Sequence, residues 1–348
     1  MNNQIFDFLN EYAKLPSPQY AVLLRGKWGC GKTYFVKNWL AEFDKSNKLP
    51  ANENSIELKP IYVSLFGMRE ISDIKSAIDR CVNPFFYSKA GKMLKIAGRI
   101  ASKIIFKTEF DIDKDGKSET SLSGALDSLS IFENDNKDEV KGVKFIIFDD
   151  LERCQISMKQ LLGFINYFVE HCDCHVVVVG EEKYLDDKTL HDLLEFKEKI
   201  VGREFEIFPD IEAAIKLFVS EPMMATDFLS KETGMIQLCF ECTATHNLRL
   251  LRQSLLDFSS LISVLPTKLV ENNHDYLRSL LSCYIAVYAE YRNIDNHDYI
   301  VDWENWAVKA FVDTKDEESQ KIRNLMGKYN RVNSLNQFEA LSSEMVSK

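Results

Sequence analysis

The sequence predicts an α/β fold in which a parallel β-sheet is followed by a helical region. Three observations support this. Short apolar stretches alternate with amphipathic ones over residues 1–210, one of these stretches precedes a glycine-rich segment that opens a helix, and strand patterns fade after residue 211. Because consecutive strands separated by helices pair in parallel through right-handed crossovers, we expect a layered sheet with helices on both faces.

Five stretches have the length and apolar content of buried strands. The third contains FIIF before two aspartates, and such a continuous apolar run is typical of a strand covered on both faces. The expected strands span residues 19–25, 60–67, 144–150, 175–182 and 203–208.

Amphipathic stretches separate these strands. In residues 32–43, Phe35, Trp39 and Phe43 recur every four positions, which places them on one side of a helix. The expected helices of this part of the chain span residues 4–15, 32–43, 71–82 and 157–172.

We expect an α/β core over residues 1–210, a helical lid over 211–265 and a C-terminal helical region over 266–348. The last contains two aromatic-rich amphipathic stretches, 275–292 and 301–312, which either pack into a core or form an interface with another chain.

Residues 85–142 interrupt the alternation and are expected to be an insertion. Residues 89–103 carry a basic helical face opposite an apolar one. This pattern suits packing on the protein's own domain or on a partner, peripheral contact with an anionic membrane, or contact with nucleic acid. The acidic residues 111–122 resemble a calcium loop, but Leu122 stands where the closing glutamate is needed, so we expect a polar turn.

Composition narrows the functional classes. The 348 residues include 43 Lys and Arg against 53 Asp and Glu, and a net charge of −10 argues against broad nucleic-acid binding. The 8 cysteines lack framework spacing and the N-terminus lacks a signal pattern, which together indicate a cytoplasmic protein with free thiols. No apolar run reaches the ~18 residues of a membrane span.

Residues 26–33, GKWGCGKT, match the phosphate-binding pattern G-x-x-x-x-G-K-[ST]. The glycines allow backbone conformations that turn successive N–H groups toward an anion, and the following helix adds its positive dipole end. Lys32 is expected to reach the β- and γ-phosphates, and the Thr33 hydroxyl to ligate Mg²⁺. The residues expected to contact the nucleotide are Gly26, Lys27, Trp28, Gly29, Cys30, Gly31, Lys32, Thr33 and Tyr34.

Residues 145–154, FIIFDDLERC, supply the second half of the predicted site. The strand ends at the same sheet edge as the phosphate loop, since all strands are expected to be parallel. We therefore expect Asp149 to contact Mg²⁺ and Asp150 to polarise the attacking water. Glu152 is a less favoured base, because the turn at Leu151 could aim it elsewhere.

Four segments together resemble the KAP family of P-loop NTPases, which is related to the AAA+ and STAND groups. They are GKWGCGKT, IIFDDLERC, FKEKIVGREFEIFP and THNLRLLRQSL, within residues 1–265. The resemblance implies a three-layer P-loop sheet of AAA+/STAND-like strand order, with the phosphate-loop strand central and beside the fourth strand, then a helical lid. Two departures are Glu152, where the family usually has Asp, and Gly180-Glu181-Glu182, where AAA+ relatives place a polar sensor.

The same resemblance implies roles for three arginines. Arg249 stands where a lid arginine would touch the γ-phosphate, and the alternative is a solvated charge on the helix face. Arg153 and Arg203 could each act as an arginine finger across a subunit boundary or form a structural ion pair. Trp28 either covers the nucleotide or packs beneath the loop.

These observations predict a Mg²⁺-dependent ATPase that works as a homo-oligomer, with a separate effector protein, or both. By resemblance alone, the family relationship suggests a bacterial anti-phage defence role. The alternative is a nucleotide-gated switch or scaffold with little turnover, which acts through a partner protein or a membrane surface.

Overall fold

The computed structural model describes residues 2–46, 56–57, 60–82, 140–141, 144–243, 245, 247–292, 317–329 and 332. The chain forms two compact units. The first comprises Met1–Gly26 and Lys32–Phe208, and the second Lys27–Gly31 and Pro209–Lys348. The short segment Lys27–Gly31 thus groups with the C-terminal unit although the chain on both sides of it belongs to the first.

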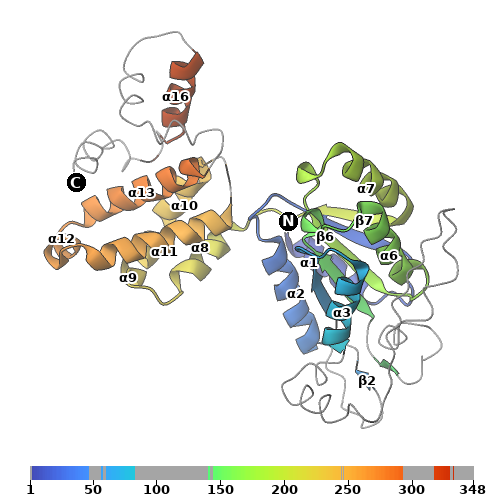
Figure 1. The fold of residues 1–348 in the computed structure, drawn as a ribbon. Helices are drawn as coiled ribbons and strands as arrows, with labels where there is room; N and C mark the ends of the chain where they lie inside the picture. The colour runs from blue at the N-terminus through green and yellow to red at the C-terminus, as the bar shows by residue number, and fades with distance from the viewer. Residues whose placement is uncertain are drawn as a thin grey trace, which may run out of the picture. The chain divides into compact units, whose positions relative to one another are not determined.

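A five-stranded sheet forms the centre of the first unit (Figure 1). Its order is β3-β5-β6-β1-β7 and all its pairs are parallel, as the sequence predicts. The strand β6 is central, and β1 lies between β6 and β7. The strands are β1 (Ala21–Arg25), β3 (Ile61–Ser64), β5 (Phe145–Asp149), β6 (His175–Gly180) and β7 (Val201–Glu206).

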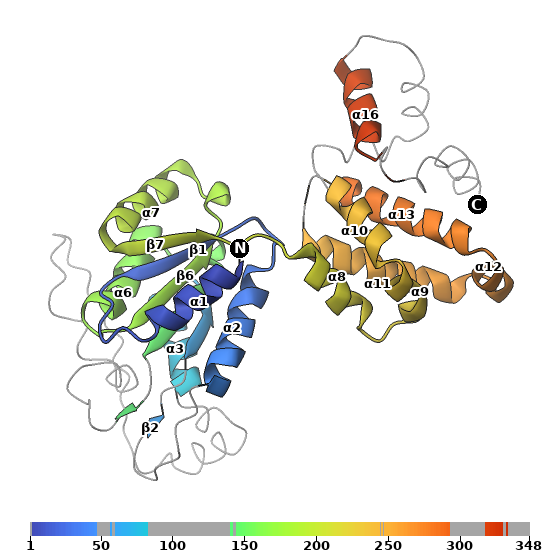
Figure 2. The ribbon, with the colours of Figure 1, turned by 180° about the vertical axis from the view of Figure 1, so that it is seen from behind.

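Helices cover both faces of this sheet and complete three layers (Figures 1 and 2). On one face, α3 (Ile71–Val82), α6 (Met158–Glu170) and α7 (Asp187–Ile200) share a single apolar core with the sheet. On the other face, the buried Tyr12 of α1 (Asn2–Tyr12) and Trp39 of α2 (Lys32–Ser46) pack against Phe145.

Two features of the first unit were not expected from the sequence. The helix α7 carries its buried residues Leu193, Phe196 and Ile200 among many charged ones, and Asp186 caps its start by accepting the Thr189 N–H at 2.9 Å. A separate two-stranded parallel sheet pairs β2 (Ile56–Glu57) with β4 (Val140–Lys141). Two-residue strands are too short to show an alternation of apolar and polar residues.

The second unit is helical in the part that the structure describes, as the predicted fold class requires. Its core joins α8, α10, α11 and α13. The buried Glu232 carboxylate pairs with Arg278 at 3.0 Å and His274 at 3.4 Å, which ties the start of α10 to α13. The helices are α8 (Ile211–Val219), α9 (Thr226–Lys231), α10 (Thr233–Cys242), α11 (Leu248–Val264), α12 (Thr267–Asn272), α13 (His274–Tyr291) and α16 (Glu317–Lys328).

Several predictions fall outside the described residues. They are the insertion over 85–142 apart from β4, including the basic face of 89–103 and the acidic turn of 111–122, and the helix over 301–312. Among the helices that are described, none combines the length and the apolar character that crossing a membrane would demand. All eight cysteines are free thiols.

Candidate phosphate-binding and catalytic site

The glycine-rich loop joins the end of β1 to the start of α2. The φ angles are +78° at Gly29 and +98° at Gly31, in the left-handed region that favours glycine. Gly26 has no positive φ, so the expected backbone freedom is used at two of the three positions. The Cys30 N–H donates to Lys27 O at 3.1 Å, which closes a turn within the loop.

Besides its positive φ, Gly29 is constrained by contacts within the second unit, to which Lys27–Gly31 belongs. The Leu248 N–H at the start of α11 donates to Gly29 O at 2.9 Å. A Cβ on Gly29 would lie 1.8 Å from Asn247 Oδ1, so no side chain fits there. Arg249 follows in the same helical turn and is exposed, and its backbone N–H donates to Asn247 Oδ1 at 3.1 Å.

The two motif residues that open α2 have different partners. Lys32 Nζ donates to Gly26 O and thereby spans the loop. Thr33 Oγ1 donates to Asp149 Oδ2 at 2.7 Å, which connects the first turn of α2 to the end of β5. Of the remaining loop residues, Cys30 is buried, whereas Trp28 and Tyr34 are exposed.

Asp149 is a buried carboxylate whose oxygens are well supplied with donors. Its side chain is 1% exposed. Oδ2 accepts hydrogen bonds from Thr33 Oγ1 and from the Tyr62 hydroxyl, both at 2.7 Å, and Oδ1 accepts the Asp150 N–H at 2.8 Å. Burying a charge is costly unless hydrogen bonds compensate, and these three do so.

Asp150 has a left-handed backbone, with φ 62° and ψ 41°. This conformation costs a non-glycine residue ~1–2 kcal/mol and is often found at functional sites. It starts the 3₁₀ turn η4 (Leu151–Arg153) and turns the chain sharply after β5. The Ser64 hydroxyl donates to Asp150 Oδ2 at 2.8 Å.

The segment after β3 runs beside the segment after β5 and holds it in place. Leu65 N–H donates to Asp149 O at 2.8 Å, and Gly67 N–H donates to Arg153 O at 3.1 Å. The Arg153 guanidinium carbon lies 5.4 Å from the centre of the exposed Phe66 ring, a cation–π contact. Arg153 is therefore at the same corner of the unit as the two aspartates.

Tyr62 and Ser64 are site residues that the sequence interpretation missed. They alternate on β3 with the buried Ile61 and Val63, so both lie on the opposite side of the strand. Burial and the hydrogen bond to Asp149 raise the pKa of Tyr62, which therefore stays a protonated donor. The sequence did contain a signal for this pair, namely two hydroxyl side chains two positions apart in an otherwise apolar strand.

Glu152 supports the site from the side of β6. Its Oε2 accepts the Glu181 N–H at 3.1 Å. A Cβ on Gly180 would lie 2.9 Å from Leu151 Cβ, so η4 packs directly on the end of β6. This geometry gives Glu152 a structural contact and explains why a glycine occupies position 180.

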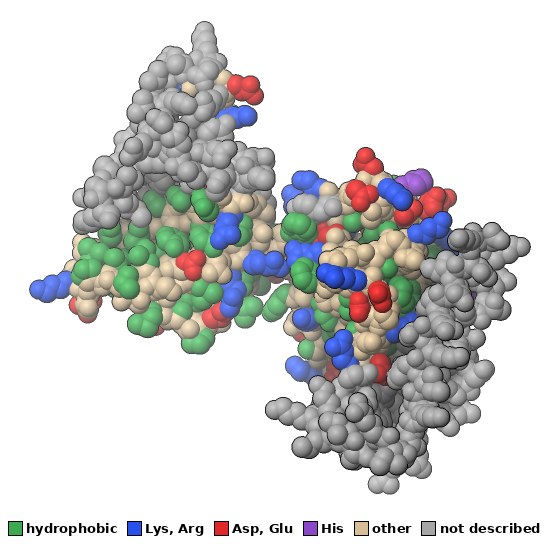
Figure 3. All heavy atoms as spheres, viewed as in Figure 1, with side chains coloured by type: hydrophobic (Ala, Val, Ile, Leu, Met, Phe, Trp, Pro, Cys, Tyr) green, Lys and Arg blue, Asp and Glu red, His purple; other side chains and the backbone are tan. Residues whose placement is uncertain are grey.

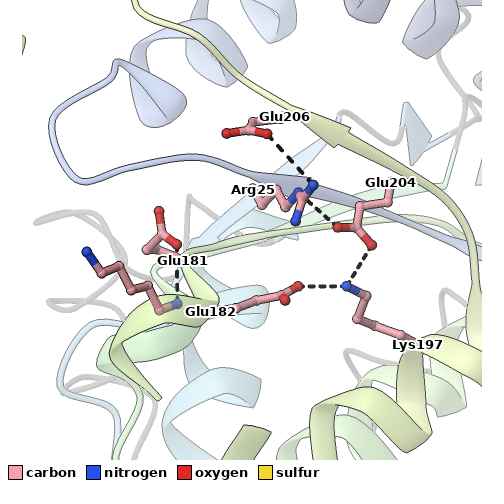
Figure 4. A network of polar contacts seen from close by, with 7 residues as sticks. Arg25, Glu181, Glu182, Lys197, Glu204 and Glu206 are labelled. Atoms are coloured by element: carbon pink, nitrogen blue, oxygen red, sulfur yellow. Dashed lines mark hydrogen bonds and ion pairs between the residues drawn. The ribbon is translucent and has the colours of Figure 1, made fainter. Parts of the chain in front are cut away.

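A network of ion pairs holds the residue that precedes the phosphate loop (Figure 4). Arg25, which directly precedes Gly26, pairs with Glu204 at 2.9 Å and Glu206 at 3.7 Å. Lys197 pairs with Glu204 at 2.6 Å and with Glu182 at 2.8 Å. Burial lowers the pKa of Lys197, but its hydrogen bonds to the two glutamates outweigh this and leave the pKa raised.

Three of the predicted site residues form one connected group. Thr33, Asp149 and Asp150 are directly connected by hydrogen bonds or sequence, with Tyr62 and Ser64 added from β3. Arg203 lies on β7, exposed and in register with Val22 of β1. Its function, like those of Arg153 and Arg249, stays a prediction.

The chain is similar to several solved structures and matches one family model. No curated protein sequence matches it significantly. Among solved structures it is similar to Cdc6p from Pyrobaculum aerophilum, at 14% identity and a TM-score of 0.39, over 75% of this chain and 62% of that chain, which is less than two thirds of Cdc6p. It is also similar to ORC2 from Aeropyrum pernix, at 11% identity and a TM-score of 0.47, over 99% of this chain and 84% of that one.

A third similar structure is AMPPCP-bound DnaA from Aquifex aeolicus, at 13% identity and a TM-score of 0.37, over 99% of this chain and 88% of that one. The family model described as the KAP family P-loop domain matches residues 1–265, well over half of the chain. Together with the phosphate loop and the aspartates at the adjacent sheet edge, this match shows that the chain belongs to the KAP family of P-loop NTPases.

Proposed function

We propose that this protein binds and hydrolyses ATP with Mg²⁺ at the ends of β1 and β5. The observation that carries the proposal is the 2.7 Å hydrogen bond between Thr33 Oγ1 and Asp149 Oδ2, directly beside Asp150. It brings together the two oxygen ligands that the motifs supply for a cation. Family membership supports nucleotide binding independently.

The residues present fit a bound Mg²⁺. Hydroxyl and carboxylate oxygens are the ligands that this hard cation prefers, and Thr33 and Asp149 provide one of each. When bound, Mg²⁺ would neutralise charge on the phosphates. Lys32 would exchange its present acceptor, Gly26 O, for phosphate oxygens, and the N–H groups of the glycine-rich loop would surround the anion.

Asp150 is the residue that we propose to orient the attacking water and accept its proton. Its left-handed backbone turns the chain out of β5, and the Ser64 hydroxyl holds one of its carboxylate oxygens at 2.8 Å. A positioned acceptor of this kind is what phosphoryl transfer to water requires, since catalysis there is mainly positioning and electrostatic stabilisation.

We further propose that assembly completes the site with an arginine. Arg153 lies beside the exposed Phe66, and Arg203 is exposed on β7, so either could serve a neighbouring copy. Arg249 at the start of α11 would act within its own chain.

The test is steady-state ATP hydrolysis and ATP binding as functions of protein concentration. We expect Mg²⁺-dependent turnover whose specific activity rises with concentration. Lys32→Ala should abolish turnover and weaken binding, because the phosphates lose their lysine. Lys45→Ala is the matched control, since Lys45 is an exposed lysine in the last turn of the same helix. Turnover in Lys32→Ala equal to that of the control would refute the proposal.

The same variant tests the shared site. If Arg153 or Arg203 acts across a subunit boundary, its alanine variant mixed with Lys32→Ala should regain part of the lost activity, because each variant supplies what the other lacks. Failure of both mixtures would exclude a trans arginine at these positions. The anti-phage role rests on family resemblance, and equal phage plating on cells with wild-type protein or Lys32→Ala would count against it.

A further inference from the structure

We propose that two hydroxyls of β3, those of Tyr62 and Ser64, are positioning residues that divide the work of orienting the two aspartates. The Tyr62 hydroxyl orients the Asp149 carboxylate toward the cation that it would bind. The Ser64 hydroxyl orients the Asp150 carboxylate toward the attacking water. The proposal rests on the proposed ATPase function and deepens it, because it says how the two carboxylates acquire different roles.

The pairing of β3 with β5 brings these residues together. The strands run parallel, with Tyr62 opposite Ile147 and Ser64 opposite Asp149. Because side chains two positions apart share a face, both hydroxyls project on the same side of β3. Each reaches a different aspartate, Tyr62 at 2.7 Å from Asp149 Oδ2 and Ser64 at 2.8 Å from Asp150 Oδ2.

Tyr62 restrains the carboxylate that stands beside Thr33. Its hydroxyl and Thr33 Oγ1 donate to the same oxygen, Asp149 Oδ2, while the Asp150 N–H donates to Oδ1. With donors on both oxygens, the plane of the carboxylate is fixed relative to the Thr33 hydroxyl. The ring of Tyr62 is itself held, since Lys37 Nζ lies 4.8 Å from its centre.

Ser64 restrains the carboxylate that follows. The Phe66 N–H donates to Ser64 Oγ at 3.4 Å, so this oxygen acts as acceptor toward the backbone and its single proton goes to Asp150. One donor on Oδ2 fixes rotation of the Asp150 carboxylate, which is what a base needs if one oxygen must point at a water.

The two roles predict different kinetic signatures. Ser64→Ala should lower kcat roughly 10- to 100-fold, the usual effect of losing a hydrogen bond to a charged group, with ATP affinity and Mg²⁺ dependence unchanged. Ser64→Thr should keep most of the activity because it retains the hydroxyl. Tyr62→Phe should raise the Mg²⁺ concentration for half-maximal rate several-fold, with kcat near wild type at saturating Mg²⁺.

The experiment measures ATP turnover, Mg²⁺ titration and ATP binding for these variants, with Ser76→Ala on the exposed side of α3 as control. Circular dichroism and thermal melting establish that each variant is folded. Wild-type kcat in folded Ser64→Ala, or a loss as large in Ser64→Thr, would overturn the role of Ser64. An unchanged Mg²⁺ requirement in Tyr62→Phe would overturn that of Tyr62.

Failure of the underlying function gives a different result. If wild-type protein binds ATP without turnover, the proposed hydrolysis fails and the role of Ser64 fails with it. The Mg²⁺ dependence of ATP binding in wild type and Tyr62→Phe still decides the role of Tyr62, because it requires no hydrolysis.

Discussion

At the scale of single residues, the end of β6 leaves no space for a side chain at position 180. A Cβ there would lie 2.9 Å from Leu151 Cβ and 3.3 Å from Glu152 Oε2. Gly180→Ala should therefore displace η4 and lower the free energy of unfolding by about 1–3 kcal/mol, the usual cost of overpacking. Chemical denaturation monitored by circular dichroism measures this.

The matched control is Gly163→Ala in α6. Gly163 is exposed, and nothing lies within 4 Å of the Cβ that the substitution adds. Because alanine is the better helix former, this variant should gain about 0.5–1 kcal/mol. Equal stability of the two variants would contradict the close packing of η4 on β6.

Local motifs explain which site residues could be found from the sequence. Lys32 and Thr33 belong to a pattern with fixed spacing, and Asp149 and Asp150 end an apolar strand. Tyr62 and Ser64 lie more than 80 positions from the aspartates, and their contact depends on which strand pairs with β5. A single sequence shows the strand but not its partner, so these two were missed.

At the scale of elements, the start of β6 carries a buried histidine. His175 is 4% exposed, its ring stacks on Phe145 with centroids 5.7 Å apart, and Nε2 lies 3.0 Å from Leu15 O. Burial lowers the pKa of His175 from its ordinary value near 6.5. Between this value and the lower pKa of the folded state, the imidazole is protonated in the unfolded chain and neutral in the folded protein.

Stability should therefore fall as the pH drops through the ordinary histidine pKa near 6.5, by at most ~1.4 kcal/mol per pH unit from this group. His175→Phe should flatten this part of the profile, because it removes the buried imidazole. Urea unfolding at several pH values measures the slopes. Identical slopes for wild type and His175→Phe would contradict the assignment.

The elements also differ in how well the sequence reveals them. Helix α3 begins and ends where the apolar periodicity predicts, at Ile71 and Val82. Helix α7 was missed because its three buried residues are outnumbered by charged residues. These charged residues lie at the surface or, like Lys197, form ion pairs. The order of the strands follows from crossover geometry only once the family is recognised.

At the scale of the whole molecule, the alternation of strands and helices followed by helices alone predicts the fold class. The grouping of Lys27–Gly31 with the C-terminal unit could not be predicted, because it depends on the contact of Gly29 with Asn247 and Leu248, over 200 positions away. Figure 3 shows apolar side chains gathered on one face of the helical unit.

In the proposed reaction, Asp150 activates water for hydrolysis of the ATP that the phosphate loop holds. The most direct test of this role compares wild type with Asp150→Asn in two measurements, the steady-state rate of ATP hydrolysis and the dissociation constant for ATP. The variant keeps the size of the side chain and removes its ability to accept a proton. We predict that turnover is abolished while ATP binds as tightly as to wild type. Equal turnover by the two proteins would contradict the role proposed for Asp150.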